Sequence, residues 1–355
     1  MSIGLRKKLA LGLFADLYKE KAEEHRLQTL FWEMTLRCNL QCRHCGSDCR
    51  ADAAAADMPL EDFLRVLDEE ITPNVDPATV LIIFSGGEVL VRRDLEEAGR
   101  AVTLRGYQWG MVTNGILLTP ERLDALTAAG LKSVSVSLDG FAEVHNDIRR
   151  NGAAFDRALA AIDAIVARPE LTYDVITCVT PPMVPRLEEF AALLEEHGVE
   201  AWRLFSIFPA GRAKSDGALT LSDGEFRTVL DFIKRMRKKG GMDVSYACEG
   251  FLGEYEAEVR DDFYQCAAGV SVASIRVDGA ISGCTSIRSN YNQGNIYEDK
   301  FWDVWQNRFE PFRNREWARR DECAECEMFR YCMGGGMHLR DGEGKLMYCH
   351  YRKLK

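Results

Sequence analysis

The stretch LFWEMTLRCNLQCRHC, residues 30–45, joins an apolar run to three cysteines spaced CxxxCxxC. The apolar run is typical of a buried strand. Cys38, Cys42 and Cys45 then fall in the loop after this strand, and active sites of α/β proteins lie at the C-terminal ends of strands. Three cysteines also leave one position of a four-iron cluster free for a cofactor or substrate. Zinc is the alternative, although structural zinc sites pair cysteines as CxxC or add histidine and fill all four positions.

Short β-rich runs alternate with helical patterns from about residue 29 to residue 209. The runs cover residues 30–36, 79–84, 108–112, 133–138, 173–179 and 201–208, and the helical patterns cover 60–71, 94–105, 120–129, 155–167 and 185–197. This alternation predicts parallel strands joined by right-handed crossovers. Six units are two short of a closed eight-stranded barrel, so the predicted α/β fold is a partial (β/α)6 barrel, open on one side.

The composition changes after residue 211. A polar link and one helix lead into turn-rich, cysteine-bearing segments and a dense Cys/Gly block from Cys323. Such a shift marks a second domain. We divide the chain into an N-terminal helical extension at 1–28, a partial barrel at 29–211, a linker and helix at 212–244, and a Cys-rich α+β domain at 245–355.

The N-terminal segment predicts an amphipathic helix with Leu5, Leu9, Leu13 and Leu17 on one face. We expect this face to pack on the protein's own domain, with a membrane surface or a partner as the alternative. The apolar stretch at 9–15 is too short to span a bilayer, and no cleavage site follows it. We therefore expect a cytoplasmic protein without a membrane span.

The whole-chain numbers exclude some classes of function. A formal charge of −10 over 355 residues counts against a nucleic-acid groove, which needs a basic stripe. The chain holds 12 cysteines without a secretory signal, and clustered cysteines in that setting bind metal more often than they form disulfides.

The first cysteine motif, CxxxCxxC after the first strand, resembles the signature of the radical S-adenosylmethionine (SAM) superfamily. This resemblance implies that one four-iron cluster, on Cys38, Cys42 and Cys45, binds SAM. An electron from the cluster then cleaves SAM to methionine and the 5′-deoxyadenosyl radical. His44 matches the family's aromatic position beside the adenine, with an ordinary loop histidine as the alternative.

Three further motifs follow the next three strands: SGGE at 85–88, TNG at 113–115 and SLDG at 137–140. Each is also typical of a strand-to-helix turn when it stands alone. The family resemblance implies that they contact SAM. The candidate SAM-binding residues are His44, Gly86, Gly87, Glu88, Asn114, Ser137, Asp139 and Arg149, the last from the segment HNDIRRNG, where a solvated arginine is the alternative.

The C-terminal cysteines resemble the SPASM extension of that superfamily, which usually holds two auxiliary four-iron clusters. Cys266 and Cys284 enclose a hairpin that contains Gly279. They are the implied ligands of a first auxiliary cluster. The implied ligands of the second are Cys323, Cys326, Cys332 and Cys349. A zinc site is the alternative for this last block.

The sequence departs from the SPASM pattern at Gly336, where the family commonly has a cysteine of the first auxiliary cluster. Cys248, His338 or an iron open to substrate would complete that cluster, or the cluster is absent. Two cysteines match no ligand set. We expect Cys178 to lie in the core, and Cys49 to lie close to the first cluster loop.

The resemblance implies an enzyme of the peptide-modifying branch. The leading hypothesis is hydrogen abstraction from a peptide or protein, leading to a crosslink or thioether, epimerisation or oxidation. The implied electron donor is a low-potential flavodoxin or ferredoxin. One alternative is a radical SAM enzyme for a small molecule, such as a tetrapyrrole side chain or a sugar, and another is a non-catalytic iron–sulfur or zinc protein. No general base is predicted.

Overall fold

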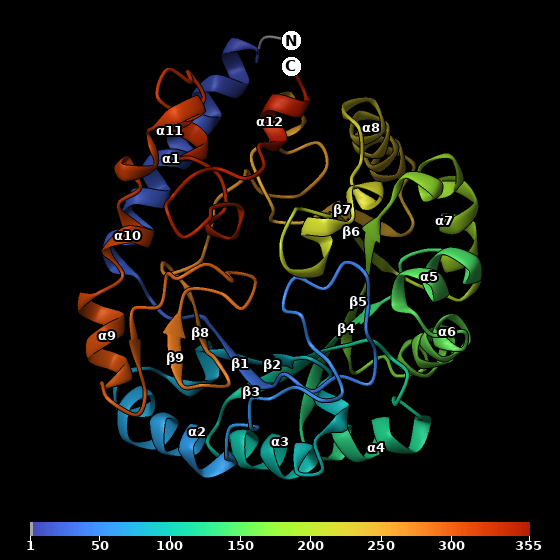
Figure 1. Ribbon diagram of the computed structural model, residues 1–355, viewed down its shortest axis with the longest axis vertical. Helices are drawn as coiled ribbons and strands as arrows, with labels where there is room; N and C mark the ends of the chain where they lie inside the picture. The colour runs from blue at the N-terminus through green and yellow to red at the C-terminus, as the bar shows by residue number, and fades with distance from the viewer. Residues whose placement is uncertain (1–2) are drawn as a thin grey trace.

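The computed structural model describes residues 3–355, which form a curved sheet with helices on its convex side (Figure 1). The 10-stranded sheet has the order β10-β9-β8-β1-β2-β3-β4-β5-β6-β7. The strands are β1 (Thr29–Thr35), β2 (Leu81–Gly86), β3 (Gln108–Thr113), β4 (Leu131–Ser137), β5 (Thr172–Val179), β6 (Ala201–Ser206), β7 (Asp243–Tyr246), β8 (Val272–Ile275), β9 (Ala280–Ser282) and β10 (Gly294–Asn295). Strands β1 to β7 are parallel, β8 is parallel to β1, and β9 and β10 are antiparallel.

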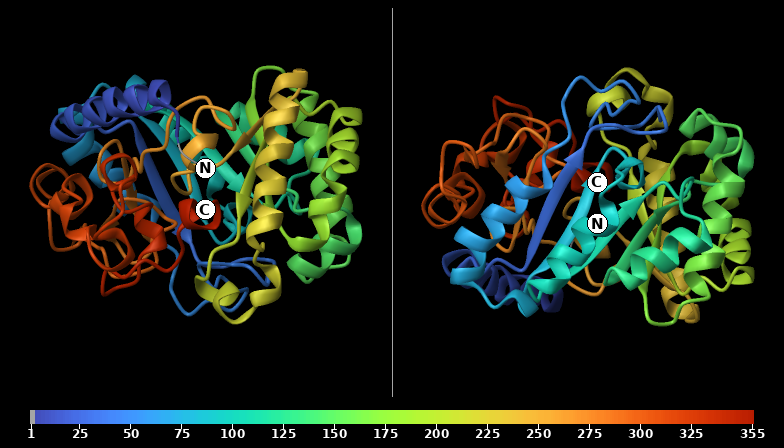
Figure 2. Two further views of the ribbon diagram at one scale, coloured as in Figure 1. Left: turned by 90° about the horizontal axis from the view of Figure 1, so that it is seen from above. Right: turned by 90° about the horizontal axis from the view of Figure 1, so that it is seen from below.

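Helices cover the outside of the sheet on one side, and the C-terminal segment lies on the other (Figures 1 and 2). The N-terminal and barrel helices are α1 (Leu5–Glu24), α2 (Leu60–Val66), α3 (Leu95–Leu104), α4 (Pro120–Ala128), α5 (Ala142–Arg149), α6 (Ala154–Val166), α7 (Leu187–Glu196) and α8 (Asp223–Lys239). The C-terminal helices are short: α9 (Phe301–Asn307), α10 (Glu310–Arg313), α11 (Phe329–Cys332) and α12 (His350–Lys353).

Successive side chains of each strand point to opposite faces of the sheet, so one face is apolar and buried and the other is polar. In β5, Val175, Thr177 and Val179 are buried against the helices, while Asp174 and Cys178 stay partly exposed on the opposite face. The helix side is packed with aromatic rings, such as Trp202 of β6. We call the space on the concave side of the sheet the lumen, and its walls carry the polar side chains.

The α/β fold with six parallel βα units is confirmed, and each predicted strand agrees with β1 to β6 within about two residues. The sheet also contains strands that the sequence pattern did not predict. Hairpin β8–β9, from the Cys-rich region, continues the sheet beyond β1 and pairs the main-chain groups that an edge strand would leave free. The boundary that we predict at residue 245 falls inside β7.

Helix α1 packs on the protein by the face opposite to the predicted one. The exposed fractions of the predicted inward-facing leucines are 76% for Leu5, 64% for Leu9, 70% for Leu13 and 54% for Leu17. The expectation that this leucine face packs inward is therefore wrong. Leu11, Tyr18 and Ala22 are buried instead, and the Tyr18 hydroxyl donates to the carbonyl of Cys266 at 3.0 Å. Tyr18 is larger than a leucine and makes a hydrogen bond when buried, so the face of α1 that carries Tyr18 packs on the protein.

None of the helices within residues 3–355 combines the length and the apolar character needed to cross a membrane.

Candidate active site and iron–sulfur centres

The three cysteines of the first motif lie together in the loop after β1. Cys38 and Cys42 are buried, and the Cys38 N–H donates to the Arg50 carbonyl at 3.0 Å, which closes the loop on itself. Burial raises the pKa of Cys38 to about 12 and also raises the pKa of Cys42. These thiols therefore need a bound cation to become thiolates, and a bound iron would supply one. The donor set fits a cluster with three protein ligands.

The GGE segment lies against the start of this loop. A Cβ on Gly86 would lie 2.1 Å from the Thr35 carbonyl oxygen, and one on Gly87 would lie 2.2 Å from that of Arg37. The Gly87 N–H donates to Thr35 O at 2.8 Å and the Glu88 N–H to Arg37 O at 3.0 Å. Only glycine at both positions allows this close approach of two main chains.

Glu88 ties the GGE segment to the TNG segment. Its carboxylate accepts from the Thr113 hydroxyl at 2.7 Å and from the Asn114 N–H at 2.8 Å. The Asn114 amide in turn donates to the Asn39 side chain at 2.8 Å and lies 4.0 Å from the Cys38 sulfur. Three separate loops at the C-terminal edge of the sheet therefore form one connected group around the first cysteine.

A buried ion pair lies on the other side of the cysteine loop. Arg149 Nε donates to Asp139 Oδ2 at 2.7 Å, and Arg149 Nη1 lies 3.8 Å from the Cys42 sulfur. Burial alone would raise the pKa of Asp139, but Arg149 holds it well below its usual range. Ser137, also buried, ends β4 two residues before Asp139. The sequence-predicted residues of β4 and α5 thus converge on the cluster loop.

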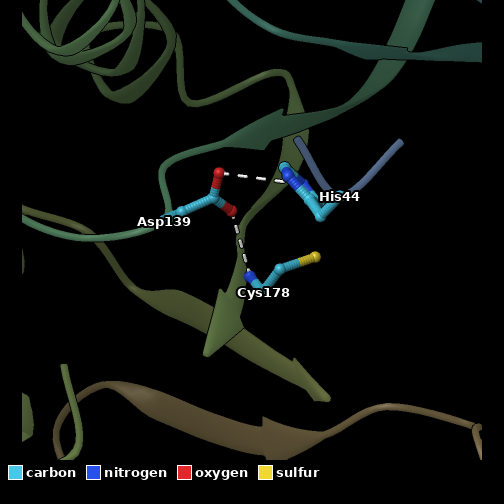
Figure 3. Close-up of side chains that lie close together, drawn as sticks. All are labelled: His44, Asp139 and Cys178. Carbon is cyan, nitrogen blue, oxygen red and sulfur yellow. Dashed lines mark hydrogen bonds and ion pairs between the residues drawn. The ribbon is translucent and has the colours of Figure 1, made fainter. Parts of the chain in front are cut away.

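His44, Asp139 and Cys178 also lie together, with their potential ligand atoms within 4.8 Å of one another (Figure 3). His44 Nε2 lies 3.9 Å from Asp139 Oδ2, and the Cys178 N–H donates to Asp139 Oδ1 at 3.1 Å. Both carboxylate oxygens already have partners and Arg149 is adjacent, so this trio is not suited to a cation. The prediction that Cys178 lies in the core is wrong, because the side chain is half-buried on the lumen face of β5.

Gly211 and Arg212 hold the cluster loop in place, and the sequence did not predict either residue as part of the site. The Arg212 N–H donates to the Cys45 carbonyl at 3.0 Å, and Arg212 Nε donates to the Cys42 carbonyl at 2.7 Å. Gly211 has φ +53°, and a Cβ there would lie 2.4 Å from Cys45 O. A Gly-Arg pair after the sixth strand was the available signal. Cys49 is buried beside this loop, where it packs against Cys45, and its thiol donates to the Ser47 carbonyl at 3.9 Å. Cys49 lowers the pKa of Cys45.

Four C-terminal cysteines line one cavity of about 230 Å³: Cys323, Cys326, Cys332 and Cys349. Burial raises the pKa of Cys332 to about 12 and raises that of Cys323 and Cys349. Arg340 Nη2 lies 3.5 Å from the Cys323 sulfur, where it would stabilise a thiolate. The arrangement of four sulfurs around a cavity fits a four-iron cluster.

Three further cysteines come from the segments after β7, before β8 and after β9: Cys248, Cys266 and Cys284. The pKa of Cys284 is raised to about 11, mainly by burial, with smaller contributions from Cys248 and Cys266. Cys248, which matched no SPASM ligand by spacing, is thus one of the groups that act on the Cys284 thiol. At Gly336, a Cβ would lie 2.5 Å from Cε1 and 2.8 Å from Nδ1 of His338. The imidazole thus occupies the space that the family's cysteine side chain would need.

Two family profiles match the chain, one described as the Radical SAM superfamily over residues 32–179 and one as an iron–sulfur cluster-binding domain, SPASM, over residues 266–327. The first spans β1 to β5, and the second spans Cys266, Cys284, Cys323 and Cys326. The chain belongs to the radical SAM superfamily. It is a SPASM-containing enzyme whose cofactors are SAM, a four-iron cluster and auxiliary iron–sulfur clusters.

Relatives of known name agree on the family and differ in substrate. The chain is 30% identical to the mycofactocin maturase MftC of Mycolicibacterium smegmatis over 312 residues, 87% of this chain and 77% of MftC. It is 28% identical to the AdoMet-dependent heme synthase of Methanosarcina barkeri over 346 residues, 91% of this chain and 96% of the synthase. The predicted family, its fold and its cofactors are confirmed.

Solved structures share the fold at lower identity. The structure of native anSMEcpe with bound AdoMet and Cp18Cys peptide has a TM-score of 0.70 at 20% identity, covering 93% of this chain and 94% of anSMEcpe. Streptococcus suis SuiB bound to precursor peptide SuiA has a TM-score of 0.67 at 14% identity, covering 92% of this chain and 74% of SuiB.

Proposed function

We propose that this radical SAM enzyme abstracts a hydrogen atom from a carbon of a peptide or protein, with Cys38, Cys42 and Cys45 holding the SAM-binding cluster. The observation that carries the assignment is the cysteine loop itself. It lies at the C-terminal edge of parallel strands, in contact with the GGE segment through the Thr35 and Arg37 carbonyls. The reduced cluster supplies the 5′-deoxyadenosyl radical by cleaving bound SAM to methionine and that radical.

The residues around the loop position SAM. Arg149 is charged, buried and directed at Cys42, so its remaining N–H groups suit the carboxylate of a cluster-bound methionine. Asp139 fixes the guanidinium and lies beside His44. The proposed SAM-binding residues also include Glu88, Asn114 and Ser137. Gly86 and Gly87 let their main chain come close to the start of the cluster loop.

The auxiliary clusters fall at two places in this proposal. Cys323, Cys326, Cys332 and Cys349 hold the second one, supported by the cavity that they line. Cys248, Cys266 and Cys284 supply three ligands of the first, and His338 or a substrate supplies the fourth. Clusters held there would supply an acceptor for an electron from the substrate radical, or a binding site for the substrate. A low-potential flavodoxin or ferredoxin reduces the enzyme, which acts in the cytoplasm.

Two substrate classes have support. A peptide is favoured by the similarity to the maturase MftC and by the fold shared with anSMEcpe and SuiB, whose structures hold peptides. A tetrapyrrole is the second candidate, because the match to the heme synthase spans nearly the whole of both chains. A related chain from Methanosarcina barkeri, 26% identical over 349 residues, is named an Fe-coproporphyrin III synthase.

Deuterium transfer separates these two classes before the substrate itself is identified. Host cells grown in deuterated medium are lysed and divided into a peptide and protein fraction and a small-molecule fraction. Each fraction is incubated with reconstituted enzyme, SAM and dithionite, and 5′-deoxyadenosine is weighed by mass spectrometry. Deuterium from the peptide fraction alone supports the leading proposal. Deuterium from the small-molecule fraction alone contradicts it and supports the second candidate.

A further inference from the structure

Two arginines approach one buried glutamate on the lumen side of β1 and β8. Glu33, in β1, is fully buried. Arg288 Nη1 lies 2.6 Å from Glu33 Oε1, and Arg276 Nε lies 3.7 Å from Glu33 Oε2. Both guanidinium groups retain part of their exposure, with side chains 18% exposed for Arg288 and 19% for Arg276, so they remain open to a ligand.

The strand register places this group on the lumen wall. Phe31 of β1 pairs with Ser274 of β8, and two residues further along lie Glu33 and Arg276. Residues two apart share one face of a sheet, so Glu33 and Arg276 face the same side as Phe31 and Ser274. Val272 and Phe31 are partly exposed on this side, whereas Leu30 and Trp32 are fully buried on the other.

The group carries one positive charge in excess. Within residues 3–355, Glu33 is the one carboxylate that forms an ion pair with Arg276 or Arg288. Two arginines elsewhere on the lumen wall are each matched by one carboxylate: Arg149 by Asp139 at 2.7 Å, and Arg203 of β6 by a carboxylate of β5 also at 2.7 Å. At Arg276 and Arg288, two cations share one carboxylate.

The hydrogen-bonding capacity of the group is also unused. In the part of the chain that the structure describes, the buried Nε atoms of Arg276 and Arg288 have no hydrogen-bond acceptor. The hydroxyl groups of Ser274 and Ser282, which pair across β8 and β9, are buried without a partner as well. Among the described residues of the group, Glu33 Oε1 is the one unpaired acceptor, so the unpaired donors outnumber it. Buried polar groups are costly when left unpaired, and this excess of donors indicates a ligand with acceptor oxygens.

The group lies next to the cluster loop. Glu33 lies in β1, which leads directly into the loop that carries Cys38, Cys42 and Cys45. Arg149, the residue assigned to the carboxylate of SAM, approaches the same loop from the side of β4 and α5, next to Cys42. Strands β2 and β3 separate β1 from β4 in the sheet. The two arginine sites thus lie on different sides of the loop.

We propose that Arg276 and Arg288 form a binding site for a carboxylate group of the substrate, an inference that rests on the function proposed above. A guanidinium offers paired N–H donors that match a carboxylate, and two of them around one buried glutamate leave room for a second anion. Glu33 balances one of the two positive charges. The carboxylate belongs to a peptide or to a side chain of a tetrapyrrole, which share this chemistry.

The test uses reconstituted enzyme and probes whose carboxylates are free or blocked. The tetrapyrrole probe is iron coproporphyrin III, compared with its tetramethyl ester. The peptide probe is a random library without Asp and Glu, with free C-termini, compared with the same library amidated. We expect wild-type enzyme to bind the free form of one probe about 10- to 100-fold more tightly than its blocked form. The probe that shows this preference identifies the source of the carboxylate.

Variants test which residues carry the preference. Arg276→Gln and Arg288→Gln are expected to remove it, whereas the exposed control Arg308→Gln, which loses an ion pair with Asp299 in the same region, is expected to retain it. Glu33→Gln removes the competing anion but leaves both guanidinium groups, so it is expected to tighten binding of the free acid. This variant keeps the test informative if an arginine variant fails to fold.

Several results would overturn the proposal. Equal affinity of wild-type enzyme for the free and the blocked form of both probes is the first. The second is a preference for the free form that stays unchanged in both arginine variants. The third is a Glu33→Gln variant that folds but does not bind the free acid more tightly than wild type does. A raised Kd for SAM in the arginine variants would instead assign the pair to SAM. Failure of the proposed function appears separately, as absence of 5′-deoxyadenosine from wild-type enzyme before any probe is added.

Discussion

Arg149 and Asp139 form a buried ion pair, with Nε of the arginine donating to Oδ2 of the aspartate across 2.7 Å. The pair spans from the end of α5 to the segment after β4, and the same guanidinium reaches the sulfur of Cys42 at 3.8 Å. Folding of the barrel and orientation of the first cluster loop therefore depend on the same contact.

Breaking this pair is expected to destabilise the fold and weaken SAM binding. Asp139→Asn leaves a buried guanidinium without its counterion, a change that costs about 3 kcal/mol or more. The double variant Asp139→Asn/Arg149→Gln removes both charges and is expected to cost less than the sum of the single changes. Denaturant unfolding and the Kd for SAM are the measurements. Additive costs would contradict a direct pair, and Arg168→Gln, from an exposed pair, is the control.

Close main-chain contact at Gly87 predicts a sharp steric effect. Gly87→Ala would place a Cβ 2.2 Å from the Arg37 carbonyl, which forces the GGE segment away from the cluster loop. We expect the Kd for SAM to rise at least about 10-fold, a cost typical of backbone displacement at a binding site. Gly46→Ala, in the cluster loop itself, meets nothing within 4 Å and is the matched control. Equal SAM affinity in the two variants would contradict the contact.

The pH dependence of stability has a contribution from His145. Its buried ring accepts a hydrogen bond from the Asp139 N–H at 2.9 Å, and burial lowers its pKa to about 3. The unfolded histidine protonates near pH 6.5, so the unfolded chain binds protons first and native stability is lost as pH falls from about 6.5 towards 3.

His145→Gln removes this titration but keeps an acceptor side chain. The difference in unfolding free energy, wild type minus variant, is expected to fall between pH 6.5 and pH 4 by up to about 1.4 kcal/mol per unit. Taking the difference cancels the acid sensitivity of the clusters, which both proteins share. A difference that stays constant over this range would mean that the ring protonates as readily in the folded protein.

Iron content tests the first auxiliary cluster. Cys248→Ser and Cys266→Ser are each expected to lower the iron of the reconstituted enzyme from about twelve to about eight per chain, since each four-iron cluster needs its thiolates. Cys178→Ser is the control, because Cys178 belongs to none of the three proposed sets of cluster ligands, and it is expected to keep about twelve. Eight irons in the wild type would show that the cluster is absent.

The space beside Gly336 offers a gain-of-ligand test of the same cluster. Gly336→Cys/His338→Ala removes the ring that blocks a Cβ at 336 and restores the family's cysteine. We expect this variant to retain iron more firmly than wild type during exposure to a chelator. The single variant Gly336→Cys is expected to fold less well, because its Cβ would lie 2.5 Å from His338. Equal stability of the two variants would contradict this geometry.

The parallel strands and the loops after them were predictable from the sequence because local periodicity reports them directly. Each SAM motif follows a strand, so strand order alone brings Glu88, Asn114 and Asp139 to one edge of the sheet. Whether Cys248 is a cluster ligand could not be predicted, because local periodicity does not report its neighbours. Its proposed grouping with Cys266 and Cys284 depends on tertiary structure, which no short spacing encodes.

Three features depended on long-range packing and were missed or wrong. The Arg276 and Arg288 pair exists only because β8 adds to the free edge of β1, about 240 residues earlier in the chain. The face of α1 that docks depends on the surface that Tyr18 meets. Cys178 lies in a strand whose two faces have similar hydrophobicity, so alternation alone did not predict its orientation.

Formation of 5′-deoxyadenosine tests the central claim most directly. Wild-type enzyme and a Cys38/Cys42/Cys45→Ala variant are reconstituted anaerobically with iron and sulfide, then given SAM and dithionite. We predict that wild type forms 5′-deoxyadenosine, while the variant keeps its auxiliary iron, loses about four irons and forms none. Equal 5′-deoxyadenosine from both proteins, or none from wild type with all clusters in place, would contradict the assignment of the SAM-cleaving cluster to these three cysteines.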